Sequence, residues 1–192
     1  RLTQAIALKP DFVQAHNNLG STLQEKGRLD EAEASYNNAI TFQPDYNVAY
    51  SNKNFFLNYS SLWSPLFIFQ QHLEFEKQFG GLEVRTTLSL PVKKQPGDKL
   101  RIGYISGDFN KHSVAYFFEP LLQHHNANAV ETFCYYNDHV IDVATKSLMS
   151  FSDHWRSIYR ISDSKTLDLI KNDKIDILVD LSGHTGKNRL LV

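Results

Sequence analysis

Apolar residues in the first third of the chain recur at the spacing of a helix face. Leu19 and Leu23 lie four positions apart, and Tyr36 and Ile40 repeat that spacing further on. Gly27 falls between the two pairs, where it is placed to end the first helix. The pattern therefore predicts two amphipathic helices that pack against each other through these side chains.

This helix pair is one unit of a repeat. Residues 13–45 fit the tetratricopeptide pattern, whose period is about 34 residues. Gly20 and Ala32 supply the small side chains that the pattern needs where the two helices cross closely. Pro10 lies one period before Pro44, so the chain begins inside the second helix of an earlier repeat. A degenerate third unit follows the complete one.

We expect residues 1–59 to form the end of a helical solenoid with further repeats upstream, because such arrays need about three repeats to bury a continuous core. Asn18 and Asn52 recur one period apart, each at the sixth position of its helix. Either they are tolerated polar residues on an exposed face, or they line the concave surface. In the second case their amides could hold the backbone of an extended polypeptide.

The composition changes after the repeats. Apolar residues within 60–79, among them Phe69 and Leu73, predict one amphipathic helix that ends at the glycines that follow it. Two prolines and a glycine then mark a loop between domains. Residues 60–99 are therefore predicted to be a helical linker and loop.

Residues 100–192 alternate short apolar segments with helical ones, which predicts βαβ units and a parallel sheet. The predicted strands are 100–106, 131–138, 154–161 and 175–183, and the predicted helices are 113–125, 142–151 and 164–173. Sites in such sheets form at the carboxyl ends of the strands. Tyr116, Phe117 and Phe118 are expected to be core residues rather than a binding platform.

Two strand ends are unusually polar. The first strand leads into SGDFNKHS, residues 106–113, and the last leads into DLSGHTGKN, residues 180–188. Neither segment is a dinucleotide fingerprint or a phosphate-binding P-loop. Their candidate polar residues are Asp108, His112, Asp180, His184 and Thr185. Lys187 and Arg189 either meet a phosphate or are solvated loop charges.

Composition removes several classes of protein. The 20 basic and 21 acidic residues nearly cancel, so a strongly basic nucleic-acid-binding protein is not expected. Cys134 is the single cysteine, which excludes an intramolecular disulfide and a cysteine-based zinc site. No apolar run approaches the roughly 20 residues that cross a bilayer. The chain begins with Arg1 and its one methionine is Met149, so we take it as a piece of a longer protein.

Three segments carry a resemblance to a known family: LRIGYISGDFNKHSVAYFFEPLL, ETFCYYND and IDILVDLSGHTGKNRL. Directly after tetratricopeptide repeats, they resemble the protein O-linked N-acetylglucosamine transferases, including the SPINDLY-type members, and look most like the bacterial ones. The resemblance implies a GT-B region with two Rossmann-like lobes. Residues 100–192 would form most of the first lobe.

The resemblance also implies a reaction and roles. The reaction is inverting transfer of N-acetylglucosamine from a UDP donor to a serine or threonine hydroxyl, without a metal or another cofactor. His112 matches the histidine considered as the base or as a close contact of the reacting groups. Asp180, His184 and Thr185 would line the cleft and contact acceptor or sugar. Asp108 either orients His112, lines the cleft as a substrate-binding residue, or is a cap or turn residue.

Three functions stay open at this point. The parent protein is a protein O-N-acetylglucosaminyltransferase, the same class of enzyme with another sugar such as fucose, or a non-catalytic tetratricopeptide scaffold. The expected partners are a polypeptide acceptor and a UDP-sugar, with no nucleic acid and no membrane, in the cytoplasm. We expect the 192 residues alone to be inactive, because in this family the uridine and phosphate contacts come mainly from the second lobe.

Overall fold

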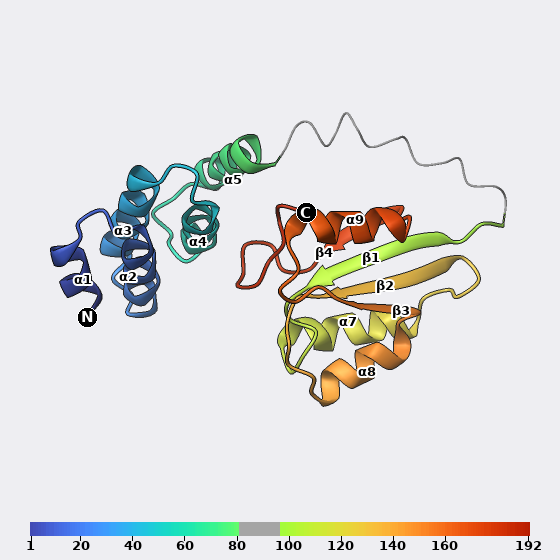
Figure 1. Ribbon diagram of the computed structural model, residues 1–192. Coiled ribbons are helices and arrows are strands. Elements are labelled where there is room, and N and C mark those ends of the chain that lie inside the picture. Colours follow the sequence, from blue (N-terminus) through green and yellow to red (C-terminus); the bar gives the residue numbers. More distant parts are fainter. Residues whose placement is uncertain (81–96) are drawn as a thin grey trace. The chain divides into compact units, whose positions relative to one another are not determined.

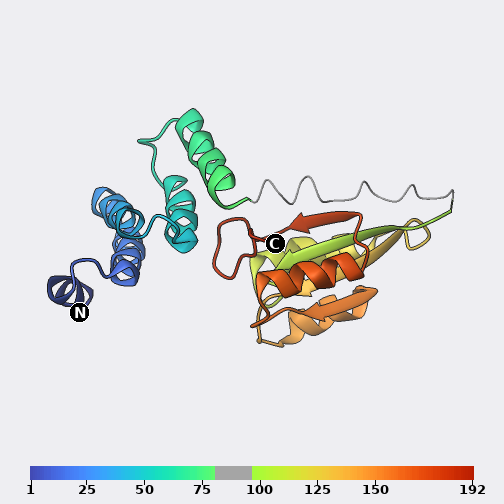
Figure 2. The ribbon, with the colours of Figure 1, turned by 45° about the horizontal axis from the view of Figure 1, so that its top comes forward.

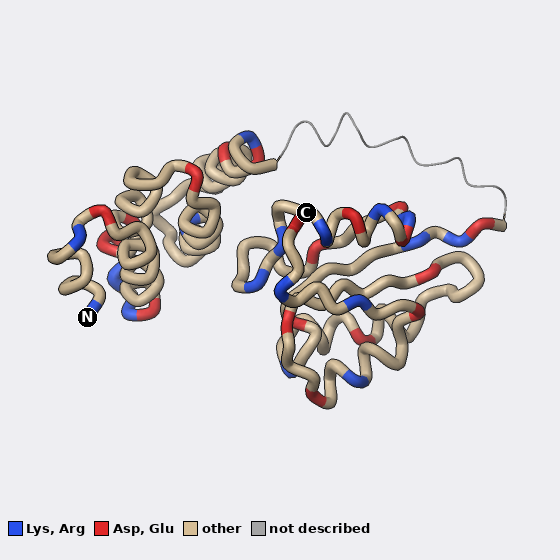
Figure 3. The backbone as a smooth tube through the Cα atoms, in the orientation of Figure 1, with Lys and Arg blue, Asp and Glu red and all other residues tan. Residues whose placement is uncertain are grey.

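The computed structural model describes residues 1–80 and 97–192 (Figure 1). The chain divides into two compact units, Arg1–Leu82 and Glu83–Val192. Residues 81–96, which include most of the predicted linker loop, lie outside the described residues. Basic and acidic residues are interspersed in both units (Figure 3).

The described part of the first unit is helical. Its helices are α1 (Leu2–Leu8), α2 (Val13–Glu25), α3 (Leu29–Phe42), α4 (Asn47–Leu57) and α5 (Pro65–Phe79). The turn after α2 shows why Gly27 is a glycine: it has a φ of 70°, in the region that side chains with a Cβ rarely adopt. Its amide donates to Gln24 O at 2.9 Å, and the Arg28 amide donates to Leu23 O at 2.9 Å. These two bonds form a Schellman motif that ends the helix.

The core of the repeat is built around Tyr36, which is 1% exposed. It packs with Leu23, Ala32 and Phe56, and its hydroxyl donates to Gln24 Oε1 at 3.0 Å. A Cβ on Gly20 would lie 2.8 Å from the Tyr36 ring. The glycine of the repeat motif therefore exists here to admit the tyrosine of the facing helix.

Helix α5 packs onto the repeat core. Ser64 accepts a hydrogen bond from the Phe67 amide at 3.2 Å and so caps the helix, which begins at Pro65. Trp63, Phe67 and Ile68 are partly buried against the cluster that contains Tyr36. The helix predicted within residues 60–79 thus begins at Pro65 and covers the end of the repeats.

The described part of the second unit contains a four-stranded parallel sheet in the order β3-β2-β1-β4. Its strands are β1 (Leu100–Ser106), β2 (Val130–Tyr136), β3 (His154–Ser157) and β4 (Ile177–Asp180), and its helices are α7 (Ser113–Gln123), α8 (Val143–Phe151) and α9 (Asp163–Asn172). Helices α7 and α8 cover one face of the sheet, and α9 covers the other (Figures 1 and 2).

Side chains alternate between these two faces along the strands, as strand geometry requires. Tyr104 and Cys134 belong to the core under α7 and α8. Ile105, Phe133 and Tyr135 belong to the core on the α9 side. The doubly covered sheet explains why the strands read as continuous apolar runs.

The structure corrects several sequence predictions: β4 spans Ile177–Asp180 instead of 175–183, and β2 ends at Tyr136 instead of residue 138. Strand β3 stops at Ser157 instead of residue 161, and Arg160 just beyond it has a φ of 60°, outside the extended region. The aromatic prediction is wrong for two of three residues: Phe118 is 4% exposed, but Tyr116 is 67% and Phe117 is 83% exposed. Helix α7 turns Phe118 toward the sheet, and its periodicity leaves the two preceding aromatics on the outer face.

Candidate active site

The two polar loops meet at one edge of the sheet. Ile105 pairs with Asp180 in the parallel register of β1 and β4, so the loops that follow these strands begin side by side. The hydroxyl oxygens of Ser106 and Ser182 lie 3.2 Å apart, and the Gly107 amide donates to Ser182 Oγ at 3.4 Å. We call residues 107–112 the first loop.

His112 lies at the amino terminus of α7. Its Nδ1 accepts a hydrogen bond from the Val114 amide at 3.3 Å, which makes it the helix cap. Because an accepting Nδ1 carries no proton, the neutral ring carries its proton on Nε2. The side chain is 46% exposed. The arrangement presents a hydrogen-bond donor at Nε2 rather than a free acceptor.

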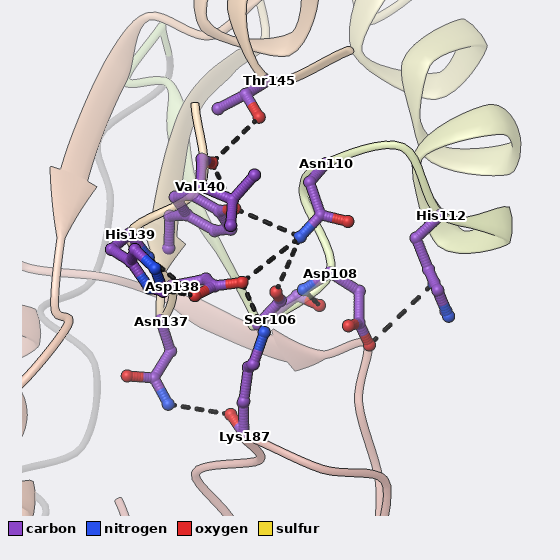
Figure 4. Close-up of polar contacts among 12 residues, drawn as sticks. Ser106, Asp108, Asn110, His112, Asn137, Asp138, His139, Val140, Thr145 and Lys187 are labelled. Carbon is purple, nitrogen blue, oxygen red and sulfur yellow. Dashed lines mark hydrogen bonds and ion pairs between the residues drawn. The ribbon is translucent and has the colours of Figure 1, made fainter. Parts of the chain in front are cut away.

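Asp108 is the acidic neighbour of His112 (Figure 4). Its Oδ2 lies 4.0 Å from His112 Nδ1, which is longer than a hydrogen bond. The Asp108 amide donates to Ser106 Oγ at 3.0 Å, so the backbone of this residue takes part in the turn after β1. The carboxylate is placed to attract His112 when the imidazole is protonated.

Asp180 ends β4, and its carboxylate accepts from the amides of Ser182 at 3.3 Å and Gly183 at 2.5 Å. Partial burial raises the pKa of Asp180, and these two amides oppose the rise. Thr185 donates its hydroxyl to Ser182 O at 2.8 Å, so it closes a turn. His184 is half-buried in the same turn. We call residues 181–188 the second loop.

Sequence reasoning did not single out Asp138, which is 2% exposed just beyond β2. Its carboxylate accepts from the Lys187 ammonium and from the His139 amide, the latter at 2.7 Å (Figure 4). Burial acts to raise the pKa of Asp138, but Lys187 and the His139 amide outweigh it, so the pKa is lowered. The available signal was an acidic residue at the carboxyl end of a predicted strand.

The two basic residues of the last segment are both engaged with carboxylates. Lys187 pairs with Asp138, and Arg189 pairs with Asp163 at 2.5 Å. Arg189 also donates to Asn137 Oδ1 at 3.1 Å. Neither residue is a freely solvated charge in this structure, because each pairs with a carboxylate and holds the chain in place. Their contact with a phosphate stays a prediction.

The two asparagines of the repeat unit differ in exposure: Asn18 is exposed and Asn52 is half-buried. Asn52 Nδ2 donates to Asn17 Oδ1 at 2.9 Å, and Asn17 Nδ2 donates to Asn18 Oδ1 at 3.4 Å. Asn17, which sequence reasoning passed over, thus links the amides of successive repeats into one row.

Among residues 1–80 and 97–192, no three His, Cys, Asp or Glu side chains are grouped so that they could hold a metal ion. Over the same ranges, no helix has the length and apolar character needed to span a membrane.

Comparison with known proteins decides the family. Residues 84–191 match the model of glycosyl transferase family 41, and residues 13–46 match the tetratricopeptide repeat. The chain belongs to glycosyl transferase family 41. Both the expected family and the expected fold, repeats followed by a Rossmann-like lobe, are confirmed.

Several relatives of this family 41 chain carry transferase names. The probable UDP-N-acetylglucosamine--peptide N-acetylglucosaminyltransferase SPINDLY of Oryza sativa subsp. japonica is 35% identical over 163 residues, which is 81% of this chain and 17% of the relative. The probable enzyme SEC of Arabidopsis thaliana is 36% identical over 100 residues, covering 50% of this chain and 10% of the relative.

A solved structure resembles the whole family 41 chain. A mutant of the Thermobaculum terrenum O-GlcNAc transferase matches with a TM-score of 0.91 and 36% identity, over 99% of this chain and 36% of that chain. The chain therefore spans about a third of that structure and less than a fifth of its SPINDLY relative.

Proposed function

We propose that this chain supplies the repeat end and the first catalytic lobe of an inverting UDP-N-acetylglucosamine peptide transferase. The observation that carries the proposal is the match at 36% identity and a TM-score of 0.91 to an O-GlcNAc transferase over 99% of the chain. The transferase names of the relatives support it. In the reaction, the acceptor hydroxyl oxygen attacks the anomeric carbon, the bond to UDP breaks with its electron pair leaving on the UDP oxygen, and the hydroxyl proton is released to solvent.

For His112 we propose a contact with the reacting groups. Its Nε2–H is available to donate a hydrogen bond to the acceptor or to the sugar, while Nδ1 is occupied by the Val114 amide. To accept the hydroxyl proton at Nε2, the ring would first have to change tautomer and give up that cap. The geometry therefore favours an orienting donor over a general base for His112.

The remaining candidates would contact substrate from the same edge. Asp180 and His184 are proposed to face acceptor or sugar. The Thr185 hydroxyl already donates a hydrogen bond to Ser182 O, so it can only accept a hydrogen bond from a substrate. Asp108 would act through His112, because its Oδ2 lies 4.0 Å from His112 Nδ1.

For the repeats we propose the peptide-holding role. The amide row of Asn18, Asn17 and Asn52 joins two successive repeats. An extended polypeptide offers backbone donors and acceptors at regular spacing, which a row of carboxamides can bind without reading side chains. The polypeptide acceptor would therefore be held by Asn18 and Asn52.

The test uses the full-length protein and transfer of radiolabelled N-acetylglucosamine from UDP to a serine- or threonine-containing protein. His112→Ala and His112→Asn are the paired variants, because asparagine also caps helices well whereas alanine does not. Both variants should lose transfer by about 100-fold or more, because a positioned hydrogen-bond donor is removed, but only His112→Ala should lose about 1 kcal/mol of stability.

Three other outcomes of the transfer assay would change the proposal. Undiminished transfer by both variants would remove His112 from the site. If only a fucose donor supported transfer, the transferred sugar would be fucose instead of N-acetylglucosamine. If no donor supported transfer, the scaffold function would be favoured.

We also propose that the 192 residues alone are inactive, since Lys187 and Arg189 are already paired with carboxylates and are not set to stabilise departing UDP. Transfer by the isolated chain would contradict this.

A further inference from the structure

Asp138 is an unusual residue for the edge of a sheet. Its side chain is 1% exposed although its ion-pair partner Lys187, 51% exposed, reaches it from solvent. A buried carboxylate is costly unless it is paired and hydrogen-bonded. Asp138 is fully supplied with donors, which come from different segments of the chain.

The strongest connection of Asp138 is to the second loop. Lys187 donates its ammonium group to Asp138, and Asn137 Nδ2 donates to Lys187 O at 2.8 Å. Two consecutive residues after β2 thus hold both the side chain and the backbone of Lys187 (Figure 4). The second loop is thereby fastened near its end, three residues beyond His184.

Lys187 also has a backbone conformation that needs support. Its φ is 62°, in the left-handed region that residues with a Cβ rarely adopt. Such a conformation persists only where the surroundings fix it. The contacts from Asn137 and Asp138 supply that restraint, and the Lys187 side chain also lies directly against Gly107.

A weaker connection runs from Asp138 to the first loop. Asn110 Nδ2 lies 3.5 Å from Asp138 Oδ2 and donates to the Tyr136 hydroxyl at 3.2 Å. On its other side, the first loop is held by Asp142, which accepts from the Lys111 amide at 2.7 Å. The first loop therefore has an anchor besides Asp138, whereas the side chain of Lys187 depends on it.

We propose that Asp138 is a positioning residue of the candidate active site. Through Lys187, Asp138 holds the second loop in place, and His184 with it. The consequence for transfer rests on the proposed function, whereas the effect on the loop does not. Because Lys187 is half-exposed, the ion pair between Asp138 and Lys187 should add no more than about 1 kcal/mol to the free energy of unfolding, a factor of about five in the unfolding equilibrium. The pair acts by selecting one conformation at the end of the second loop.

The loop itself is tested in the 192-residue chain by amide hydrogen exchange. The reporter is the Thr185 amide, which donates to Ser182 O at 3.1 Å. Asp138→Asn keeps the shape and an acceptor for His139 but removes the charge, and should speed exchange at Thr185 about tenfold or more. Lys187→Met should do the same, and Lys187→Arg, which keeps the charge, should stay close to the parent chain.

Arg156→Met is the matched control. Arg156 pairs with Asp173 at 3.0 Å, so the variant breaks another ion pair to a largely buried carboxylate, away from the second loop. It should leave Thr185 exchange unchanged. Asp138 does not position the loop if the Thr185 amide of Asp138→Asn exchanges at the rate of the parent chain. The same follows if Arg156→Met speeds this exchange as much as Asp138→Asn does.

The functional consequence is measured as transfer by the full-length protein. Asp138→Asn and Lys187→Met should each lower kcat about 10- to 100-fold, with the donor KM within about twofold. The double variant should be no worse than either single one, because both act through one contact. Unchanged kcat in a variant whose loop exchanges faster would refute the consequence for catalysis; a parent protein without transfer would refute the proposed function alone.

Discussion

Replacing Gly107 by alanine should disturb the second loop, because the end of β1 leaves no room for a side chain. A Cβ at this position would lie 2.6 Å from Lys187 Cβ and 3.3 Å from Lys187 O. Real Cβ atoms essentially never approach within 3.0 Å of another heavy atom. The atom that the new methyl group would meet is bonded directly to the backbone, so a side-chain rotation cannot relieve the contact and the loop must move.

The magnitude follows from two opposing effects. Inserting a methyl group into a packed site costs about 1–3 kcal/mol, and replacing glycine by alanine returns about 0.4–1 kcal/mol by restricting the unfolded chain. The middle of the first range exceeds the middle of the second by about 1 kcal/mol, so the free energy of unfolding should fall by about that amount. Gly186→Ala is the control: its Cβ would meet nothing within 4 Å and its φ is not positive. That variant should be neutral or slightly more stable.

The assay uses the placement of the two tryptophans in different units. Trp63 packs on the repeat core, and Trp155 packs on Phe109 at 5.6 Å between ring centroids. In a Trp63→Phe background, fluorescence during urea unfolding therefore reports on the α/β unit alone. If Gly107→Ala proves as stable as Gly186→Ala, Lys187 of the second loop does not lie against Gly107, and the predicted clash is wrong.

Three further predictions concern other parts of the chain. Gly20→Ala should lower the stability of the repeats by up to about 2 kcal/mol in thermal unfolding, because the clash with Tyr36 exceeds the gain in helix propensity. Arg189→Met should cost about 2–3 kcal/mol in urea unfolding, because two backbone carbonyls and a carboxylate lose a charged donor. The lowered pKa of Asp138 means that its contribution is present above the unfolded pKa of about 3.9 and is lost as the pH falls through the folded pKa. Asp138→Asn should therefore weaken the acid dependence of stability, and an unchanged dependence would contradict the assignment.

Much of the fold could be predicted because local patterns encode it. The repeat follows from small residues at Gly20 and Ala32 and from apolar residues at helical spacing, since both are set by close contact between two neighbouring helices. The order of strands and helices follows from apolar segments separated by capped helices. Strand ends were less predictable, as the left-handed Arg160 after β3 shows.

The candidate site could be predicted only in part. The polar strand ends placed His112 and Asp180 at one edge, because the carboxyl ends of parallel strands lie together. Their hydrogen bonds were not predictable, and the cap that His112 gives α7 alters its expected chemistry. Tyr116 and Phe117 were misplaced because a run of aromatics does not show which side of a helix is covered.

The sequence by itself determined the repeat, the parallel α/β lobe and the two loops that carry His112 and His184, because these depend on period, propensity and strand direction. Only the tertiary structure showed that Asp138 is buried and meets Lys187, a residue 49 positions away. No local pattern records such a pairing, since it arises where separate segments pack. The same packing decided that Lys187 and Arg189 hold the chain in place.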